Sequence, residues 1–141
     1  MNYLKHTINI MYMSEYVQAF NNQFEELLEN ISLIFPNDAE ISSASRGLKN
    51  LRRLNPKIIV KVFYDYVDKP YGAYIHDNNL TFFLEKDYSK DVSGSIFSGE
   101  ILSKIAVIKN PIANMSKKEQ DIILKYLQNL CKLTTLYYSS V

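Results

Sequence analysis

The stretch that most constrains the fold is NPKIIVKVFYDYVD, from Asn55 to Asp68, because no other part of the chain is apolar over so many consecutive residues. At 100° per residue, its apolar side chains cover about two-thirds of a helix circumference and leave a narrow polar stripe that includes Lys61. A helix that is apolar on most sides needs neighbours on most sides. We therefore expect a buried central helix over about residues 56–68, with Phe63 in the core and Lys61 in solvent.

A β-strand is the alternative for this stretch, because four of its first apolar residues are β-branched. Two features favour the helix. Asn55 is a good N-cap, and Pro56 suits the first helical position, where its missing N–H has no partner to lose. A strand would place Lys61 on the same face as Ile59 and Phe63, which would bury a charge or expose core residues.

The length and composition are typical of one globular domain, which we assign to residues 1–141. Hydrophobic residues make up 47% of the 141 residues and charged residues 22%, which excludes a disordered or fibrous chain. No segment reaches the roughly 18 consecutive apolar residues that cross a bilayer, so no membrane association is expected. Cys131 is the only cysteine and cannot form an intramolecular disulfide, which indicates a reducing, intracellular setting.

Apolar periodicity predicts an amphipathic helix over residues 14–34, ended by Pro36, whereas polar residues interrupt residues 1–13 and favour an irregular N-terminal segment. Asn37 and Glu40 form a capping-box pattern at the start of a second helix. Gly47 weakens that helix by about 1 kcal/mol relative to Ala unless a neighbouring side chain packs closely there.

The second half of the chain gives shorter signals before one long helix. We expect short helical or turn pieces at 70–75 and 80–84, and a surface loop at 86–98 with its most mobile point at 91–95. A helix is predicted from Gly99 to just before Pro111. Ser116 and Glu119 form a second capping box, which begins a long helix over 116–138. Together these patterns predict an all-α bundle of five to six helices around residues 56–68.

The net charge of +1 conceals a strong gradient, because residues 1–40 hold one base and six acids, whereas residues 41–64 hold six bases and no acid. Arg46, Lys49 and Arg53 recur at helical spacing on one face of the second helix, and Arg52 and Lys57 lie beside them. This basic face could bind phosphates, and nearby tyrosines could stack on unpaired bases.

Acidic residues of the first helix offer a simpler role for the same bases. Glu25, Glu26 and Glu29 lie on a helix that we expect to run antiparallel to the second, where they can pair with its arginines. A net charge near zero also argues against a dedicated nucleic-acid-binding protein.

No residue pattern points to catalysis, a cofactor or a metal ion. His6 and His76 are far apart and lack other ligands at metal-binding spacing, and the four glycines are scattered, so they form no phosphate-binding loop. Cys131 and His76 could in principle act as a nucleophile and its base. We favour a buried structural thiol, because Cys131 lies in the middle of a predicted helix between leucines.

Several segments resemble short, uncharacterised proteins of large nucleocytoplasmic DNA viruses, the giant viruses. The segments that carry the resemblance are FNNQFEELL (20–28), FPND (35–38), LNPK (54–57), FFLEKDYS (82–89), NPIANM (110–115) and KYLQNLCKL (125–133). None is a catalytic motif, and the group has no activity to transfer to individual residues. The resemblance implies a viral protein located inside the host cell or in the virion.

From these observations we expect a non-enzymatic protein that acts as a protein–protein interaction or virion-associated module. Its partner would be another protein or a second copy of the chain. The alternative is a nucleic-acid-binding protein. Its contact residues would be Arg46, Lys49, Arg52, Arg53 and Lys57.

Overall fold

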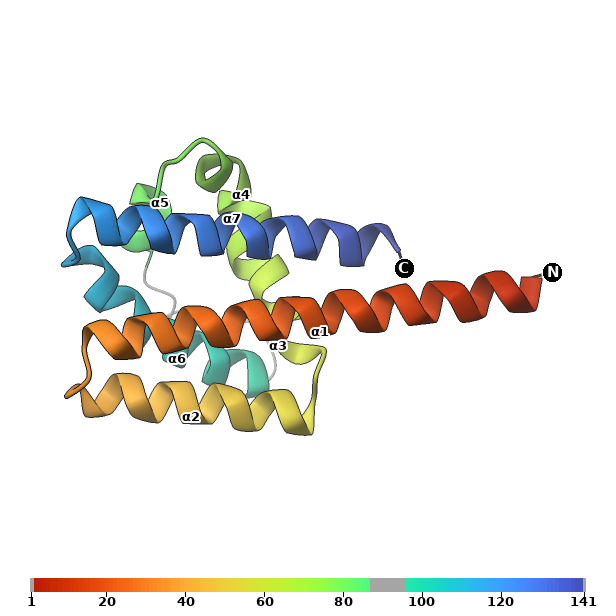
Figure 1. The fold of residues 1–141 in the computed structure, drawn as a ribbon, viewed down its shortest axis with the longest axis horizontal. Coiled ribbons are helices and arrows are strands. Elements are labelled where there is room, and N and C mark those ends of the chain that lie inside the picture. The colour runs from red at the N-terminus through yellow and green to blue at the C-terminus, as the bar shows by residue number, and fades with distance from the viewer. Residues whose placement is uncertain (1, 87–95, 141) are drawn as a thin grey trace.

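The computed structural model describes residues 2–86 and 96–140, and all regular secondary structure in those ranges is helical (Figure 1). The predicted all-α class is therefore confirmed. The elements are α1 (Asn2–Ile34), α2 (Ala39–Leu54), α3 (Ile58–Phe63), the π-helical segment η1 (Tyr64–Asp68), α4 (Lys69–His76), α5 (Thr81–Glu85), α6 (Ile96–Ala113) and α7 (Lys117–Ser139).

The helices surround one continuous cluster of buried side chains. α1 packs along α7 more extensively than any other pair of helices, and α2 packs on both α1 and α6. In Figure 1, α1 lies between α7 and α2, and α6 runs behind α1. The stretch from α3 to α4 contacts α1, α2, α6 and α7, so it lies inside the bundle as the sequence predicts.

The apolar central stretch is buried, and its polar residues face outward. Phe63 is 2% exposed, and Val62 and Val67 are equally inaccessible, whereas Lys61 lies in solvent. Phe63 packs edge-on against Phe20 of α1, with ring centroids 5.4 Å apart. The predicted environments of Phe63 and Lys61 are therefore both confirmed.

The ends of the central helix differ from the prediction. It begins at Ile58 because Asn55 is the C-cap of α2 and not an N-cap: its N–H donates to the Leu51 carbonyl at 2.8 Å. Asn55 is extended, with φ −147° and ψ 90°, which is the conformation favoured by a residue before proline. The Ile58 N–H then donates to the Asn55 carbonyl at 3.2 Å, which starts the next helix after one turn.

The same helix continues beyond Asp68, where the sequence predicts its end. α3, η1 and α4 follow one another without a break, and the Lys69 N–H donates to the Tyr64 carbonyl in the wider π turn. Pro70 lies two residues after the π-helical segment, so its missing N–H removes one hydrogen bond from this continuous helix. Ile75 of α4 is fully buried, so packing holds the chain in the helix past the proline.

α1 begins at Asn2, which corrects the expectation of an irregular segment over residues 1–13. Adding a residue to an existing helix costs little, because only the first turn carries the cost of nucleation. Polar residues such as Thr7 do not stop this extension, and the Thr7 hydroxyl donates to the carbonyl of Tyr3 at 3.0 Å within the helix.

The cap of α2 is also shifted by one residue from its predicted position. Asp38, rather than Asn37, is the N-cap, and its Oδ1 accepts from the N–H groups of Glu40 and Ile41 at 3.0 and 3.1 Å. Both residue types cap helices well, but a carboxylate also interacts favourably with the positive end of the helix dipole. The predicted Ser116–Glu119 capping box at the start of α7 is confirmed.

α6 differs from the predicted helix at both ends. It begins at Ile96, inside the predicted 86–98 loop, whose 91–95 point lies outside the described residues. It also runs through Pro111 to Ala113, because proline removes only one hydrogen bond near the end of a helix and Ile112 is buried in the core. The aliphatic stem of Lys104 of α6 packs over Gly47 of α2, so this glycine allows two helices to approach closely.

Candidate functional site

The predicted basic face is part of the surface of α2 and the turn that follows it. Arg46, Arg53 and Lys57 are exposed, whereas Lys49 and Arg52 are half-buried against neighbouring helices. The structure therefore brings all five predicted residues to one side of the bundle, but it divides them into two groups with different surroundings.

The half-buried pair is engaged by acids of α1. Arg52 lies 3.0 Å from the Glu25 carboxylate and donates to Asn22 Oδ1 at 2.7 Å, while Lys49 lies 3.9 Å from Glu29. Each exposed or half-exposed pair of this kind contributes about 0–1 kcal/mol, so these contacts orient α2 on α1 more than they stabilise it. They also neutralise two of the five bases.

The exposed group keeps its charge available. Arg53 donates to Asn50 Oδ1 at 2.5 Å, which holds the guanidinium without neutralising it. Arg46 and Lys57 form no ion pair with any residue in the described ranges. Three separated cations can contact phosphates, but they form no built anion site.

An open hollow of about 340 Å³ adjoins this face, where α1 passes the turn between α2 and α3. Asn21 lies at its base, is 2% exposed and donates through Nδ2 to the Pro56 carbonyl at 2.8 Å. Its Oδ1 is buried without a hydrogen-bond partner among the described residues. Sequence reasoning missed Asn21, although a polar residue between Phe20 and Phe24 on an apolar helix face was the available signal.

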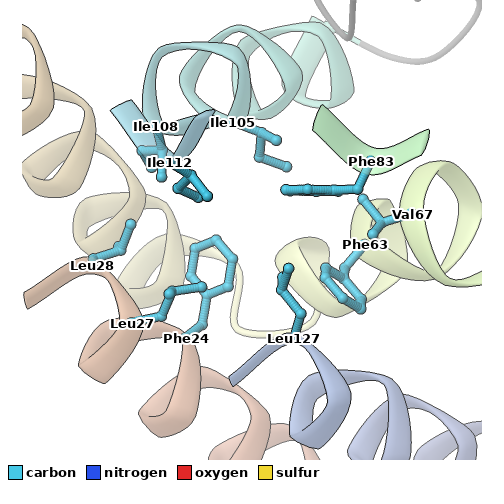
Figure 2. A pocket seen from close by; sticks show the side chains of 10 residues that line it. All are labelled: Phe24, Leu27, Leu28, Phe63, Val67, Phe83, Ile105, Ile108, Ile112 and Leu127. Carbon is cyan, nitrogen blue, oxygen red and sulfur yellow. The ribbon is translucent and has the colours of Figure 1, made fainter. Parts of the chain in front are cut away.

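A gap among side chains of the described core is apolar and small. Figure 2 shows ten side chains from α1, α3, η1, α5, α6 and α7 directed toward it. Its volume is about 30 Å³, which matches roughly one water molecule and is far below the roughly 300 Å³ of a small-molecule site. We therefore interpret it as a packing gap. The lining residues are Phe24, Leu27, Leu28, Phe63, Val67, Phe83, Ile105, Ile108, Ile112 and Leu127.

A polar contact joins the central helix to α7. The Asp68 carboxylate accepts a hydrogen bond from the Cys131 thiol, and its Oδ1 lies over Gly72, where a Cβ would come within 2.5 Å of it. Burial raises the pKa of Asp68, although the Cys131 hydrogen bond and the charge of His76 both lower it. Glycine at position 72 is therefore what allows the carboxylate to fold back onto its own helix.

This contact bears directly on Cys131 and His76 as a nucleophile and base. Cys131 is fully buried, and that burial, followed by the nearby Asp68 charge, raises the pKa of its thiol well above 9.0. A reactive cysteine needs an accessible thiolate, which burial and a neighbouring carboxylate both disfavour. The surroundings of Cys131 are thus those of a structural thiol. His76 is exposed at the end of α4.

Aromatic side chains cluster where η1 meets the end of α7. Tyr64 and Tyr138 stack with ring centroids 4.0 Å apart, and the Lys69 ammonium lies 4.9 Å from the centre of the Tyr64 ring. Burial, together with the Asp65 carboxylate and the adjacent tyrosines, raises the pKa of Tyr138 to about 12. The cluster fixes η1 against α7, and Lys69 also pairs with Asp65 at 3.9 Å.

The first turns of α1 form a surface that sequence reasoning did not identify. We define the N-terminal arm as residues 3–15, which precede Val17, the first residue of α1 that the structure describes as buried. In Figure 1 this part of α1 projects beyond the ends of α7 and α2. Its large apolar side chains in solvent are Tyr3 (83% exposed), Leu4 (60%), Ile8 (40%) and Met11 (59%). Scattered single apolar residues are ordinary on surfaces, but four within nine residues are not.

Two further classes of site are absent from the residues that the structure describes. No group of three or more His, Cys, Asp or Glu side chains could hold a metal ion there. In the same ranges, no helix combines the length and apolar character that crossing a bilayer requires.

Comparison with known proteins gives no relative from which a role could be transferred. No protein-family model, curated protein or solved structure matches the chain.

Proposed function

We propose that this protein is a non-enzymatic protein–protein interaction module, associated with the virion of a large DNA virus, and that it binds through the N-terminal arm. The observation that carries the proposal is the exposure of Tyr3, Leu4, Ile8 and Met11 on a helix that extends past the bundle. Burying such side chains against a partner contributes about 25 cal/mol per Å² of apolar surface. Burying the arm against a protein partner would therefore be favourable.

The test is affinity purification of the full-length protein from infected cells, with the virion and soluble fractions analysed separately. The arm variant is Leu4→Glu/Ile8→Glu. The matched control is Leu33→Glu, which changes another exposed leucine of α1 (79% exposed) outside the arm. We expect a virion protein, or an untagged second copy of this chain, to co-purify with the wild type and the control but not with the arm variant. Identical protein sets from all three would overturn the proposal.

A second candidate, nucleic-acid binding, is favoured by one observation: Arg46, Arg53 and Lys57 are exposed and carry no acidic partner among the described residues. We rank it second because Glu25 and Glu29 already engage the other two bases.

Binding to phosphates releases counterions and weakens steeply with salt, so a titration of labelled single- and double-stranded DNA and RNA at two salt concentrations separates the two functions. The control is a variant with alanine at positions 46, 49, 52 and 53. Binding at physiological salt with a Kd of about 1 μM or tighter, lost in this variant while its helicity is kept, would reverse the ranking.

A further inference from the structure

We infer that the partner of the N-terminal arm is a second copy of this chain, bound through an antiparallel pair of arms. This inference rests on the proposed function, because it names the occupant of the surface proposed there. It is carried by three observations on the arm: the register of its apolar side chains, the positions of its two exposed charges, and its projection past the bundle.

Three of the four exposed apolar side chains form one stripe along the arm, and Tyr3 lies off it. Leu4, Ile8 and Met11 follow at i, i+4 and i+7, which places them on one face of the helix at 100° per residue. Glu15 continues that face toward the bundle, and Lys5 lies beside Leu4. This face is opposite the one that α1 buries through Val17 and its successors in the core, so a partner can reach it without displacing the bundle.

The charges of Lys5 and Glu15 make two arms complementary only when the arms run antiparallel. When Ile8 of one copy faces Met11 of an antiparallel second copy, Lys5 of each copy comes next to Glu15 of the other. A parallel pair would instead place Lys5 beside Lys5 and Glu15 beside Glu15, which like-charge repulsion disfavours. Within one chain these residues are about 15 Å apart along the helix, so they cannot pair with each other.

The shape of the molecule allows this arrangement. Because each arm extends beyond its bundle, two antiparallel arms overlap side by side while the two bundles lie at opposite ends. The overlap covers about three helical turns. The surface that each arm buries there is smaller than the roughly 800 Å² per partner of a standard interface. We therefore expect a dimer with a Kd in the micromolar range.

A lipid surface fits the arm less well than a second copy does. Helices that lie on membranes carry several Lys or Arg residues on their polar face, which attract anionic headgroups. The described charges of the arm are one base and one acid, Lys5 and Glu15, both exposed. Their opposite signs suit a partner with the same charges in reverse order.

The experiment is sedimentation equilibrium of the full-length protein at roughly 1–500 μM, a range that brackets the expected Kd. Four proteins are compared: the wild type, Lys5→Glu, Glu15→Lys and the double variant Lys5→Glu/Glu15→Lys. Each single change creates two like-charge contacts and should weaken dimerisation about tenfold, whereas the double variant restores both ion pairs and the wild-type Kd within about threefold. Leu4→Glu/Ile8→Glu should remain monomeric.

Far-UV circular dichroism of each variant checks that the helices are retained, and the charge variants change only exposed residues that need not affect folding. A wild type that stays monomeric overturns the inference, as does a double variant no better than the single ones, or a dimer that survives Leu4→Glu/Ile8→Glu. A monomer that still captures a virion protein through the arm overturns this inference alone and leaves the proposed function standing. A monomer that binds anionic vesicles through the arm overturns both.

Discussion

Truncating Phe63 to alanine tests whether the central helix anchors the core. The Phe63 ring is 2% exposed, packs edge-on against Phe20 and borders the apolar gap of about 30 Å³. Alanine at this position would merge the volume of the missing ring with that gap. The native core would then hold one enlarged, dry cavity lined by aliphatic and aromatic side chains.

The expected cost combines two effects. Losing the burial of the ring removes about 2–3 kcal/mol of transfer free energy. The cavity left by the ring is on the order of 100 Å³ and costs about 2.4 kcal/mol at about 24 cal/mol per Å³. Partial collapse of the neighbouring side chains reduces the sum, so we expect the free energy of unfolding to fall by roughly 3–5 kcal/mol. A protein of this length should then melt roughly 10–20 °C lower.

Urea denaturation followed by circular dichroism measures the change, with Phe82→Ala as the matched control. Phe82 is the same residue type but is 43% exposed and stacks on Tyr74 at the surface, with ring centroids 4.1 Å apart. The control should lose no more than about 1 kcal/mol, the worth of one aromatic pair. A loss below about 1 kcal/mol for Phe63→Ala as well would refute the placement of this ring in the core.

Three further outcomes follow from individual contacts. Val67→Ile adds one methyl group toward the apolar gap and should raise the free energy of unfolding by about 0.5–1 kcal/mol, whereas Val62→Ile, which does not line the gap, should lower it by about 1–3 kcal/mol in the same denaturation assay. The folded-state pKa of Asp68 is raised, so its contribution to stability is present below pH 3.8 and is lost as the pH rises through the folded-state pKa. Asp68→Asn keeps an oxygen acceptor and should gain stability over the wild type as the pH rises from about 4 to 7, a gain that denaturation at each pH would detect and that a constant deficit would contradict. Asp38→Ala should cost about 1 kcal/mol through loss of the α2 cap while Asn37→Ala costs little, and equal costs in parallel thermal melts would contradict the cap assignment.

Local sequence patterns predicted the structure correctly where the contacts that determine it join residues close in the sequence. The Ser116–Glu119 capping box depends on residues three apart, and both of its hydrogen bonds are present. The exposure of Lys61 and the burial of Phe63 depend only on helical periodicity around a strongly apolar stretch, and both predictions are confirmed. The all-α class follows from many such segments agreeing with one another.

The predicted ends of helices were wrong where two local preferences compete, or where packing in the core decides where a helix ends. Asn37 and Asp38 are both good caps, and the side chain that reaches the backbone amides is fixed only in three dimensions. Asn55 matches an N-cap pattern, but the proline after it imposes an extended conformation that ends α2. The continuation past Asp68 depends on the burial of Ile75, which is invisible to a window that stops at Pro70.

The candidate site was predictable only in part. The predicted pairing of acids on the first helix with arginines of the second is present for Glu25 and Arg52, whereas Glu29 pairs with Lys49 and not with an arginine. Glu26 instead accepts a hydrogen bond from Gln23, because ion pairing depends on the side that each helix turns to its neighbour. The arm was missed because residues 1–13 were expected to form an irregular segment, and because its projection past the bundle depends on where the surrounding helices end.

The pairing of α1 with α7 has a consequence for how the chain is made. α1 ends at Ile34 and α7 ends at Ser139, so the helix with which α1 shares its largest contact is synthesised long after it. At roughly 5–20 residues per second, this interval lasts roughly 5–20 s. During that time the nascent chain carries part of the apolar face of α1, including Phe24 and Ile31, uncovered by its final neighbour. A chain whose translation stops before α7 would expose this face permanently, which makes truncated products prone to aggregation and to capture by chaperones.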